Sequence, residues 1–209
     1  MFFFTYLLLG FFIAASGSIV PSFLNLTVVK FSLKSGRKSA YYLIAGFATV
    51  LFLQANIGAY LSSVLMKNSE YITIIQKVGT GILFLLSLNF FRMYFTSKKR
   101  KKKEDIDKSK AYLHGIGMSL LNTFAIPFYF TSISFLIGLE YFEYSILNSL
   151  YFSIGSTVGS FSLYAMYATV ASKIEHKLTF IATKMDFILG CLTGVVGIGN
   201  LVYLLLFKG

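Results

Sequence analysis

Six long runs of uncharged, mostly apolar residues dominate the sequence and leave few ways for it to fold. They cover residues 1–29, 39–66, 78–91, 111–139, 144–172 and 187–207. A helix needs about 20 apolar residues to cross roughly 30 Å of hydrocarbon. Only 13% of the residues are charged, against roughly 25% in soluble globular proteins. The pattern therefore predicts a polytopic membrane protein.

The runs favour helices over a β-barrel, because each is continuously apolar and does not alternate in segments of about ten residues. The third run is the shortest, but Lys77 and Arg92 can extend towards the two interfaces of a span over 71–96. We therefore predict an all-α integral membrane protein with six transmembrane helices. The first run has no basic residue before it, so we expect a retained span and not a cleaved signal peptide.

The positive charge lies mainly in alternate loops. Of 19 Lys and Arg residues, 16 fall within residues 30–38, 92–110 and 173–184. Basic residues in short loops stay cytoplasmic, so we predict an inner-membrane protein with both termini outside. The run KKRKKKEDIDKSK, residues 98–110, contains no aromatic residue. We expect it to contact anionic lipid headgroups and not nucleic acid.

The two halves of the chain resemble each other in three places. SFLNLTVV and SLLNTFAI align Asn25 with Asn122, and Gly46 matches Gly155 in the following spans. The third match is a Gly followed ten residues later by an Asn, at Gly79 and Asn89 and at Gly190 and Asn200. Such matches indicate an internal duplication.

Three spans in each half is an odd number, so the second half would enter the membrane with opposite orientation. The predicted arrangement is a 3+3 inverted repeat, an architecture of many secondary transporters. It divides the chain into a first three-helix repeat (residues 1–96), a basic cytoplasmic linker (97–110) and a second three-helix repeat (111–209).

The first and fourth spans carry residues that favour a break in the helix. Pro21 follows a Ser-Gly-Ser cluster, and Pro127 lies five residues after Asn122. Proline lacks an amide hydrogen and clashes with the preceding turn. Two interrupted segments at corresponding places in two halves indicate a transport site. The alternative is a packing role, in which the small residues only let helices approach closely.

The candidate site residues are polar or helix-breaking positions in the spans. For substrate binding they are Pro21, Ser22, Asn25, Gln54, Asn56, Asn122, Thr123 and Pro127. His114 and Asp186 are the candidates for coupling to an ion gradient, because few other ionisable groups occur in the spans. Both could instead be interfacial, with Asp186 stabilising a helix N-terminus or pairing with Lys184.

Several of these motifs resemble the LysE-type translocators, the lysine/threonine/homoserine exporter family. Pro21, Asn25, Ser35-Gly36-Arg37-Lys38 and Ala45-Gly46 are similar to its first half. Gly115, Gly117 and Leu121-Asn122 are similar to its fourth span. The resemblance covers essentially the whole chain and implies a six-span exporter of amino acids.

This chain differs from the family pattern at three motifs. Pro21-Ser22-Phe23 replaces a Pro-Gly-Pro-like motif, and Asn122-Thr123 replaces Asn-Pro. Gln54-Ala55-Asn56 lies where many relatives carry an acidic residue in the second span. Because this acidic residue is absent, the resemblance does not imply lysine as the substrate or a simple proton-coupling scheme.

We therefore predict a secondary transporter and not an enzyme: an exporter of amino acids or related small zwitterions that works by alternating access. No nucleotide-binding motif is present, so we expect an ion gradient to drive it. We expect no cofactor and no bound metal. The alternatives are a metal-ion exporter, a membrane-embedded enzyme and a non-catalytic scaffold. The sequence leaves the substrate, coupling ion, direction and oligomeric state open, a homo-oligomer included.

Overall fold

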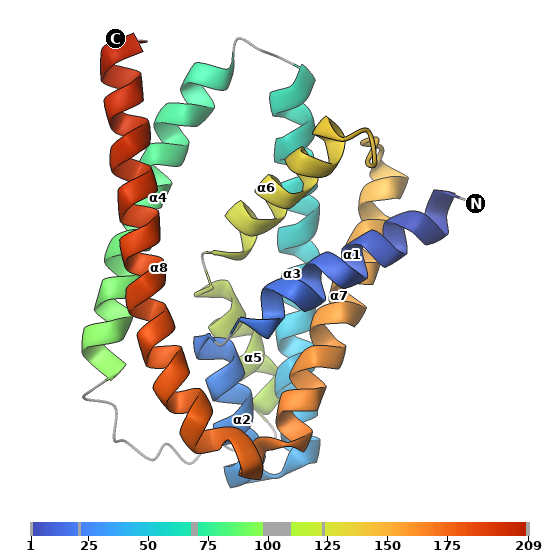
Figure 1. Ribbon diagram of the computed structural model, residues 1–209. Helices are drawn as coiled ribbons and strands as arrows, with labels where there is room; N and C mark the ends of the chain where they lie inside the picture. Colours follow the sequence, from blue (N-terminus) through green and yellow to red (C-terminus); the bar gives the residue numbers. More distant parts are fainter. Residues whose placement is uncertain (1, 21, 68–70, 98–109, 123, 208–209) are drawn as a thin grey trace. The chain divides into compact units, whose positions relative to one another are not determined.

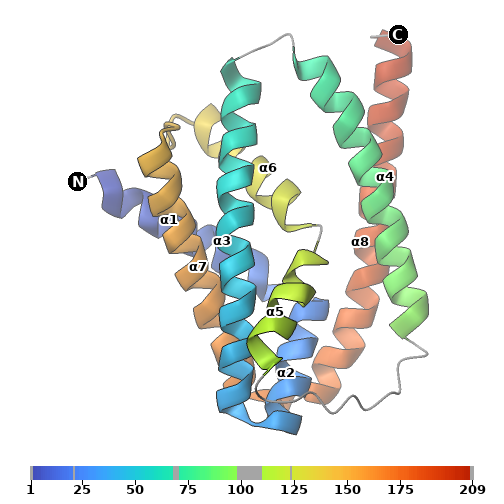
Figure 2. The same ribbon diagram turned by 180° about the vertical axis from the view of Figure 1, so that it is seen from behind.

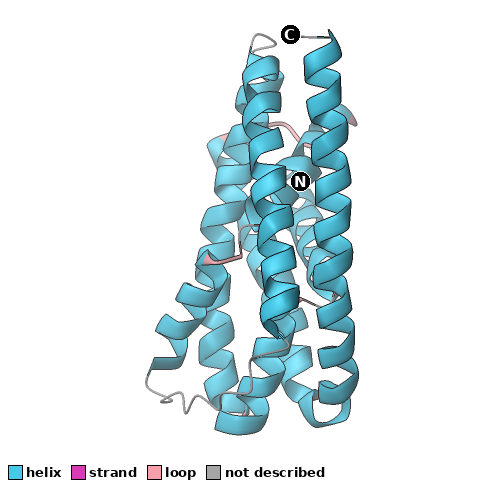
Figure 3. Cartoon of the chain, turned by 90° about the vertical axis from the view of Figure 1, so that its left-hand side faces the viewer, coloured by secondary structure: helices cyan, strands magenta, loops and turns pink. Residues whose placement is uncertain are grey.

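The computed structural model describes residues 2–20, 22–67, 71–97, 110–122 and 124–207 (Figure 1). Throughout these ranges the regular elements are α-helices, and no strand occurs in them (Figure 3). The all-α prediction is confirmed. The helices are α1 (Phe2–Ile19), α2 (Phe23–Ser35), α3 (Arg37–Lys67), α4 (Tyr71–Ser97), α5 (Ala111–Leu120), α6 (Ala125–Gly138), α7 (Ile146–Thr169) and α8 (Ala171–Phe207).

The chain forms two compact units. The first comprises Met1–Ser63 and Glu104–Thr179, and the second comprises Val64–Lys103 and Phe180–Gly209. Each unit takes segments from both halves of the sequence. These units are defined by packing, whereas the two predicted repeats are defined by sequence similarity between the halves. The predicted repeat boundaries therefore remain a prediction.

In the first unit, α1 packs directly against α7 (Figure 1). The contact depends on glycines, because a methyl group added at Gly10 would overlap the carbonyl oxygen of Phe152. On α7, a methyl group at Gly155 would overlap the carbonyl of Leu7, and one at Gly159 would overlap that of Phe11. Small residues let helix backbones approach this closely in membrane proteins.

The same kind of contact joins α3 to α5. A methyl group at Gly46 would overlap the Tyr112 carbonyl oxygen, and one at Gly115 would overlap that of Leu43. Farther along α3, the Ser62 hydroxyl donates a hydrogen bond of 2.8 Å to the Phe130 carbonyl on α6. One long helix therefore packs on both pieces of the fourth predicted span.

In the first and fourth apolar runs the helix is interrupted and bent, near the residues that the sequence indicates. The axes of α1 and α2 differ by 79°, and those of α5 and α6 by 64° (Figures 1 and 2). Within the described residues, two helices are long and apolar enough to span a membrane, and counting each bent pair as one span gives four. The fold is that of a multi-pass membrane protein, while the count of six spans remains a prediction.

The second unit is an antiparallel pair formed by α4 and the larger part of α8, which lie side by side in both views (Figures 1 and 2). The Ser87 hydroxyl donates to the Gly190 carbonyl at 2.8 Å, and the Asn200 amide donates to the Thr80 hydroxyl at 2.7 Å. Asn200 thus forms an interhelical hydrogen bond. Elsewhere on α8, Val195 and Leu205 are about 70% exposed, as lipid-facing residues would be.

Candidate functional site

Asn25 connects the two sides of the first break. Its side chain is fully buried, and its Nδ2 donates a hydrogen bond of 2.8 Å to the Ser18 carbonyl near the end of α1. Its Oδ1 accepts from the Ser22 amide at 3.0 Å and from the Ser22 hydroxyl at 2.6 Å. Asn25 therefore satisfies backbone groups that the break removes from the helical ladder, as a buried break requires.

Tyr167 covers a second carbonyl at this break. Its hydroxyl, on α7, donates a hydrogen bond of 3.0 Å to the carbonyl of Ile19, the last residue of α1. Two side chains from different helices therefore hold the end of α1.

Gln54 on α3 lies beside the second break. Its Nε2 lies 3.5 Å from the Ser119 carbonyl and 3.5 Å from the Asn122 carbonyl. Its Oε1 is buried without a hydrogen-bond partner among the described residues. The structure thus brings together Gln54 and Asn122, two of the predicted site residues, and an amide side chain lies against backbone carbonyls at each break.

Pro127 lies in the first turn of α6, which begins at Ala125. An amide hydrogen at that position would have no helical acceptor, so proline is tolerated there. Pro127 therefore marks the restart of the helix after the break and does not disrupt α6. Pro21 and Thr123, also predicted site residues, lie outside the described residues.

The two breaks meet in the first unit. A methyl group at Gly17, near the end of α1, would come within 2.6 Å of the Phe128 ring on α6. The Ser18 hydroxyl lies 3.4 Å from the Ser160 hydroxyl on α7. The Tyr129 ring of α6 packs edge-on against the Phe152 ring of α7, with centroids 6.4 Å apart. The end of α1 and the start of α6 thus converge on one face of α7.

That face of α7 carries a row of buried serines, which we call the serine row: Ser149, Ser153, Ser156 and Ser160. They are at most 3% exposed. Their spacing of i, i+4, i+7 and i+11 places them on one side of a helix. The sequence contains this spacing, but our site prediction missed it.

Asn56, another predicted site residue, contacts the serine row. Its Oδ1 accepts a hydrogen bond of 3.0 Å from the Ser149 hydroxyl, and its Nδ2 donates to the Phe52 carbonyl at 2.9 Å. Asn56 therefore links α3 to α7 at some distance along α7 from Ser160. The hydrogen bonds of Asn56 and those of Asn25 share no residue.

The two coupling candidates occupy different units. His114 is half-buried on α5, and its ring stacks on that of Phe31 with centroids 6.3 Å apart. The backbone of Asp186 lies in α8, and its side chain is outside the described residues. The described residues contain no group of three or more His, Cys, Asp or Glu that could hold a metal ion.

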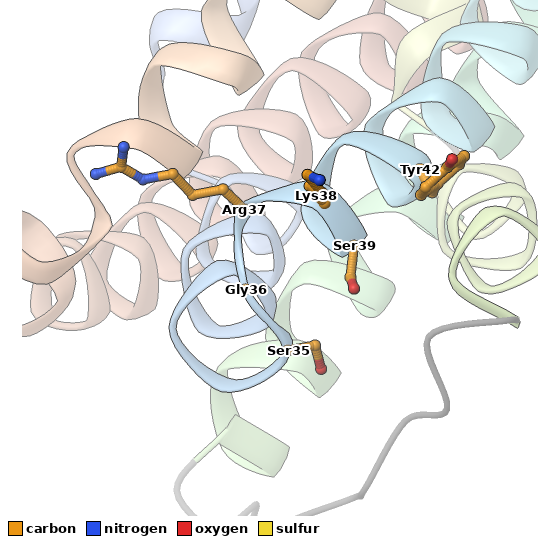
Figure 4. A pocket seen from close by; sticks show the side chains of 6 residues that line it. All are labelled: Ser35, Gly36, Arg37, Lys38, Ser39 and Tyr42. Carbon is orange, nitrogen blue, oxygen red and sulfur yellow. The ribbon is translucent and has the colours of Figure 1, made fainter.

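A separate hollow of about 590 Å³ lies at the turn between α2 and α3 (Figure 4). Gly36 makes this turn with a φ of 84°, a value that favours glycine. The Arg37 side chain extends away from Ser35 and Ser39 in Figure 4 and donates a hydrogen bond of 3.2 Å to the Thr169 carbonyl. The hollow shares no residue with either break.

Comparison with known proteins gives one match. The family model described as "LysE type translocator" matches residues 15–204, which include both breaks and the serine row. The chain matches no curated protein and no solved structure. Because the family model covers most of the sequence, the chain belongs to the LysE type translocator family and is a membrane transporter, not an enzyme.

Proposed function

We propose that this protein exports amino acids or related small zwitterions, and that the solute binds where the two broken spans meet. One observation carries the proposal: Gly17 and Ser18 at the first break lie against α6 and α7, close to the start of the helix that follows the second break. Broken helices in corresponding segments form the binding sites of many secondary transporters.

The helix ends at the breaks suit a zwitterion. At each break one helix ends and another begins: α1 gives way to α2, and α5 gives way to α6. A helix N-terminus carries a partial positive charge and a C-terminus a partial negative charge, each of about half a unit. The N-termini can therefore bind a carboxylate and the C-terminal carbonyls an ammonium group.

The side chains that cover the breaks would exchange partners during transport. Asn25, Gln54 and Tyr167 now donate to the carbonyls of Ser18, Asn122 and Ile19, respectively. A bound ammonium group can replace these donors without leaving a carbonyl unpaired. The side chains would then stabilise the site when it is empty and yield to the solute when it binds.

The helix contacts support an inverted repeat. α1 packs on α7, and α3 packs on α5, so the first span of each half contacts the second span of the other. Gly46 and Gly155, which the sequence aligns, make these two contacts with α5 and α1. α4 and α8, from the third and sixth spans, pair with each other. The pattern of helix contacts is the same when the first half of the chain is exchanged with the second. An inverted repeat that works by alternating access requires this symmetry.

The orientation of the protein in the membrane follows from the distribution of its basic residues. The protein would lie in the inner membrane. Its basic loops, at residues 30–38, 92–110 and 173–184, would face the cytoplasm. Residues 98–109 lie outside the described residues, and contact between this run and anionic lipid remains a prediction. An ion gradient would drive export, with His114 or Asp186 as the coupling group.

The test compares metabolites in the medium of cells that express the wild type or Asn122→Ala at matched membrane abundance. The Asn122 side chain makes no hydrogen bond within the described part of the chain, so its removal should leave the fold intact. We expect an amino acid to accumulate outside with the wild type and at least about fivefold less with the variant, which corresponds to one lost hydrogen bond.

The same experiment can refute the proposal. If wild-type cells and cells without the protein release the same compounds, export of amino acids is wrong. If the wild type and Asn122→Ala export equally, Asn122 is not part of the binding site.

A further inference from the structure

We infer that Tyr129, Ser156 and Ser160 form a specificity subsite that selects amino acids with uncharged side chains. We call these three residues the hydroxyl subsite. The inference rests on the proposed function, because it concerns the solute that binds at the two breaks. None of the three was among the residues predicted from sequence.

The hydroxyl subsite lies beside both breaks. Tyr129 is four residues after the start of α6, and its ring packs edge-on against that of Phe152, one helical turn before Ser156 on α7, with centroids 6.4 Å apart. Ser160 lies 3.4 Å from Ser18, whose carbonyl is bonded to Asn25 at the first break. A solute held by the helix ends at the breaks would therefore place its side chain next to these hydroxyl groups.

The hydroxyl groups are not all satisfied in this structure. Ser156 is fully buried, and its Oγ makes no hydrogen bond of good geometry with the described residues. Ser153, its neighbour in the serine row, is also fully buried, and its Oγ also lacks a hydrogen-bond partner among the described residues. Most buried polar groups have a partner, and each group that lacks one is costly. Two such hydroxyls on the helix face that meets both breaks are explained if a ligand supplies the partner during transport.

The buried side chains described in the first unit offer no countercharge to a charged solute side chain. Every side chain with a polar group that is buried there, among the residues whose side chains are described, is an uncharged Ser, Asn, Gln or Tyr. Burying a lysine or arginine side chain without an opposite charge is strongly unfavourable. Hydroxyl groups, in contrast, can both donate to and accept from an uncharged polar group. The subsite should therefore admit neutral amino acids and reject cationic ones.

The test uses purified protein in liposomes loaded with an equimolar mixture of the 20 standard amino acids. Downhill efflux is measured by mass spectrometry, so no coupling ion needs to be known. We expect the wild type to release neutral amino acids at least about tenfold faster than lysine or arginine. For the best-released amino acid, Tyr129→Phe and Ser156→Ala should each raise the half-saturating concentration about five- to tenfold, as expected for one hydrogen bond.

Tyr141→Phe is the matched control, because it removes a tyrosine hydroxyl from a residue that is 66% exposed outside the subsite. It should leave both efflux and the half-saturating concentration unchanged. Melting of each variant in detergent separates weaker binding from unfolding: a binding role predicts a higher half-saturating concentration at an unchanged melting temperature.

The outcomes separate this inference from the proposed function. If the wild type exports neutral amino acids but Tyr129→Phe and Ser156→Ala bind them as the wild type does, the hydroxyl subsite is wrong and the function stands. Preferential release of lysine or arginine would likewise overturn the selectivity while leaving export intact. If none of the 20 amino acids leaves faster than from protein-free liposomes, the proposed function fails and the subsite falls with it.

Discussion

Replacement of Gly115 by alanine is expected to destabilise the protein severely. A methyl group there would overlap the carbonyl oxygen of Leu43 on α3, which is backbone and cannot move aside without moving the helix. Overpacking of this kind typically costs about 1–3 kcal/mol and sometimes more. The expected result is a large fall in the temperature at which the protein loses its single peak on size-exclusion chromatography in detergent.

Gly117→Ala is the matched control on the same helix. Nothing lies within 4 Å of a methyl group at Gly117, and alanine favours the helix over glycine by up to about 1 kcal/mol. The control should therefore melt at the same temperature as the wild type or slightly above it. Equal melting temperatures for Gly115→Ala and Gly117→Ala would contradict the close packing of α3 on α5.

Replacement of Asn25 by alanine should abolish export and also lower stability. The substitution removes the donor to the Ser18 carbonyl and the acceptor for the Ser22 amide. Buried groups left without partners cost about 1–3 kcal/mol each, so the total loss should exceed roughly 2 kcal/mol. The measurement is the melting temperature in detergent, together with efflux from liposomes at matched protein content.

Asn122→Ala provides the comparison for Asn25→Ala. Both remove an amide at a break, but the Asn122 side chain is half-buried and has no hydrogen bond within the described residues. We expect Asn122→Ala to reduce transport while the melting temperature stays near that of the wild type. If the two variants lose stability equally, Asn25 has no special role in holding the first break together.

The breaks themselves could be predicted from sequence because their causes are local. The first and fourth runs are too long for straight spans, and they contain proline, glycine and serine near an asparagine. Local chemistry of this kind acts within one or two helical turns, so it can be read without knowledge of the fold. The bends of 79° and 64° are in agreement with it.

The partners of the breaks could not be predicted, because they come from other helices. Gln54 is 65 residues from Ser119, and Tyr167 is 148 residues from Ile19. The sequence identified Gln54 as a candidate site residue within a span but did not show which break it contacts. Its position at the second break results from the packing of α3 on α5 through Gly46 and Gly115.

The serine row could be predicted from the sequence only in part. Its helical spacing is present in the sequence, but serine is common in membrane helices, where it often bonds to the carbonyl four residues before it. Ser153 and Ser156 make no such bond in the structure. Only burial and the missing partners distinguish them from ordinary packing residues, and both depend on the tertiary structure.

The most direct test of the transport site is the access of water-soluble reagents to Ser160. This residue is 1% exposed in the present structure, yet alternating access requires it to meet water on each side of the membrane in turn. Ser160→Cys would be made in a Cys191→Ser background, which removes the only native cysteine. We predict that a small membrane-impermeant thiol reagent labels it from either side of the membrane. Single cysteines introduced into the loops serve as positive controls for labelling. If these controls react while the thiol at position 160 stays unlabelled from both sides, a transport site at the two breaks is contradicted.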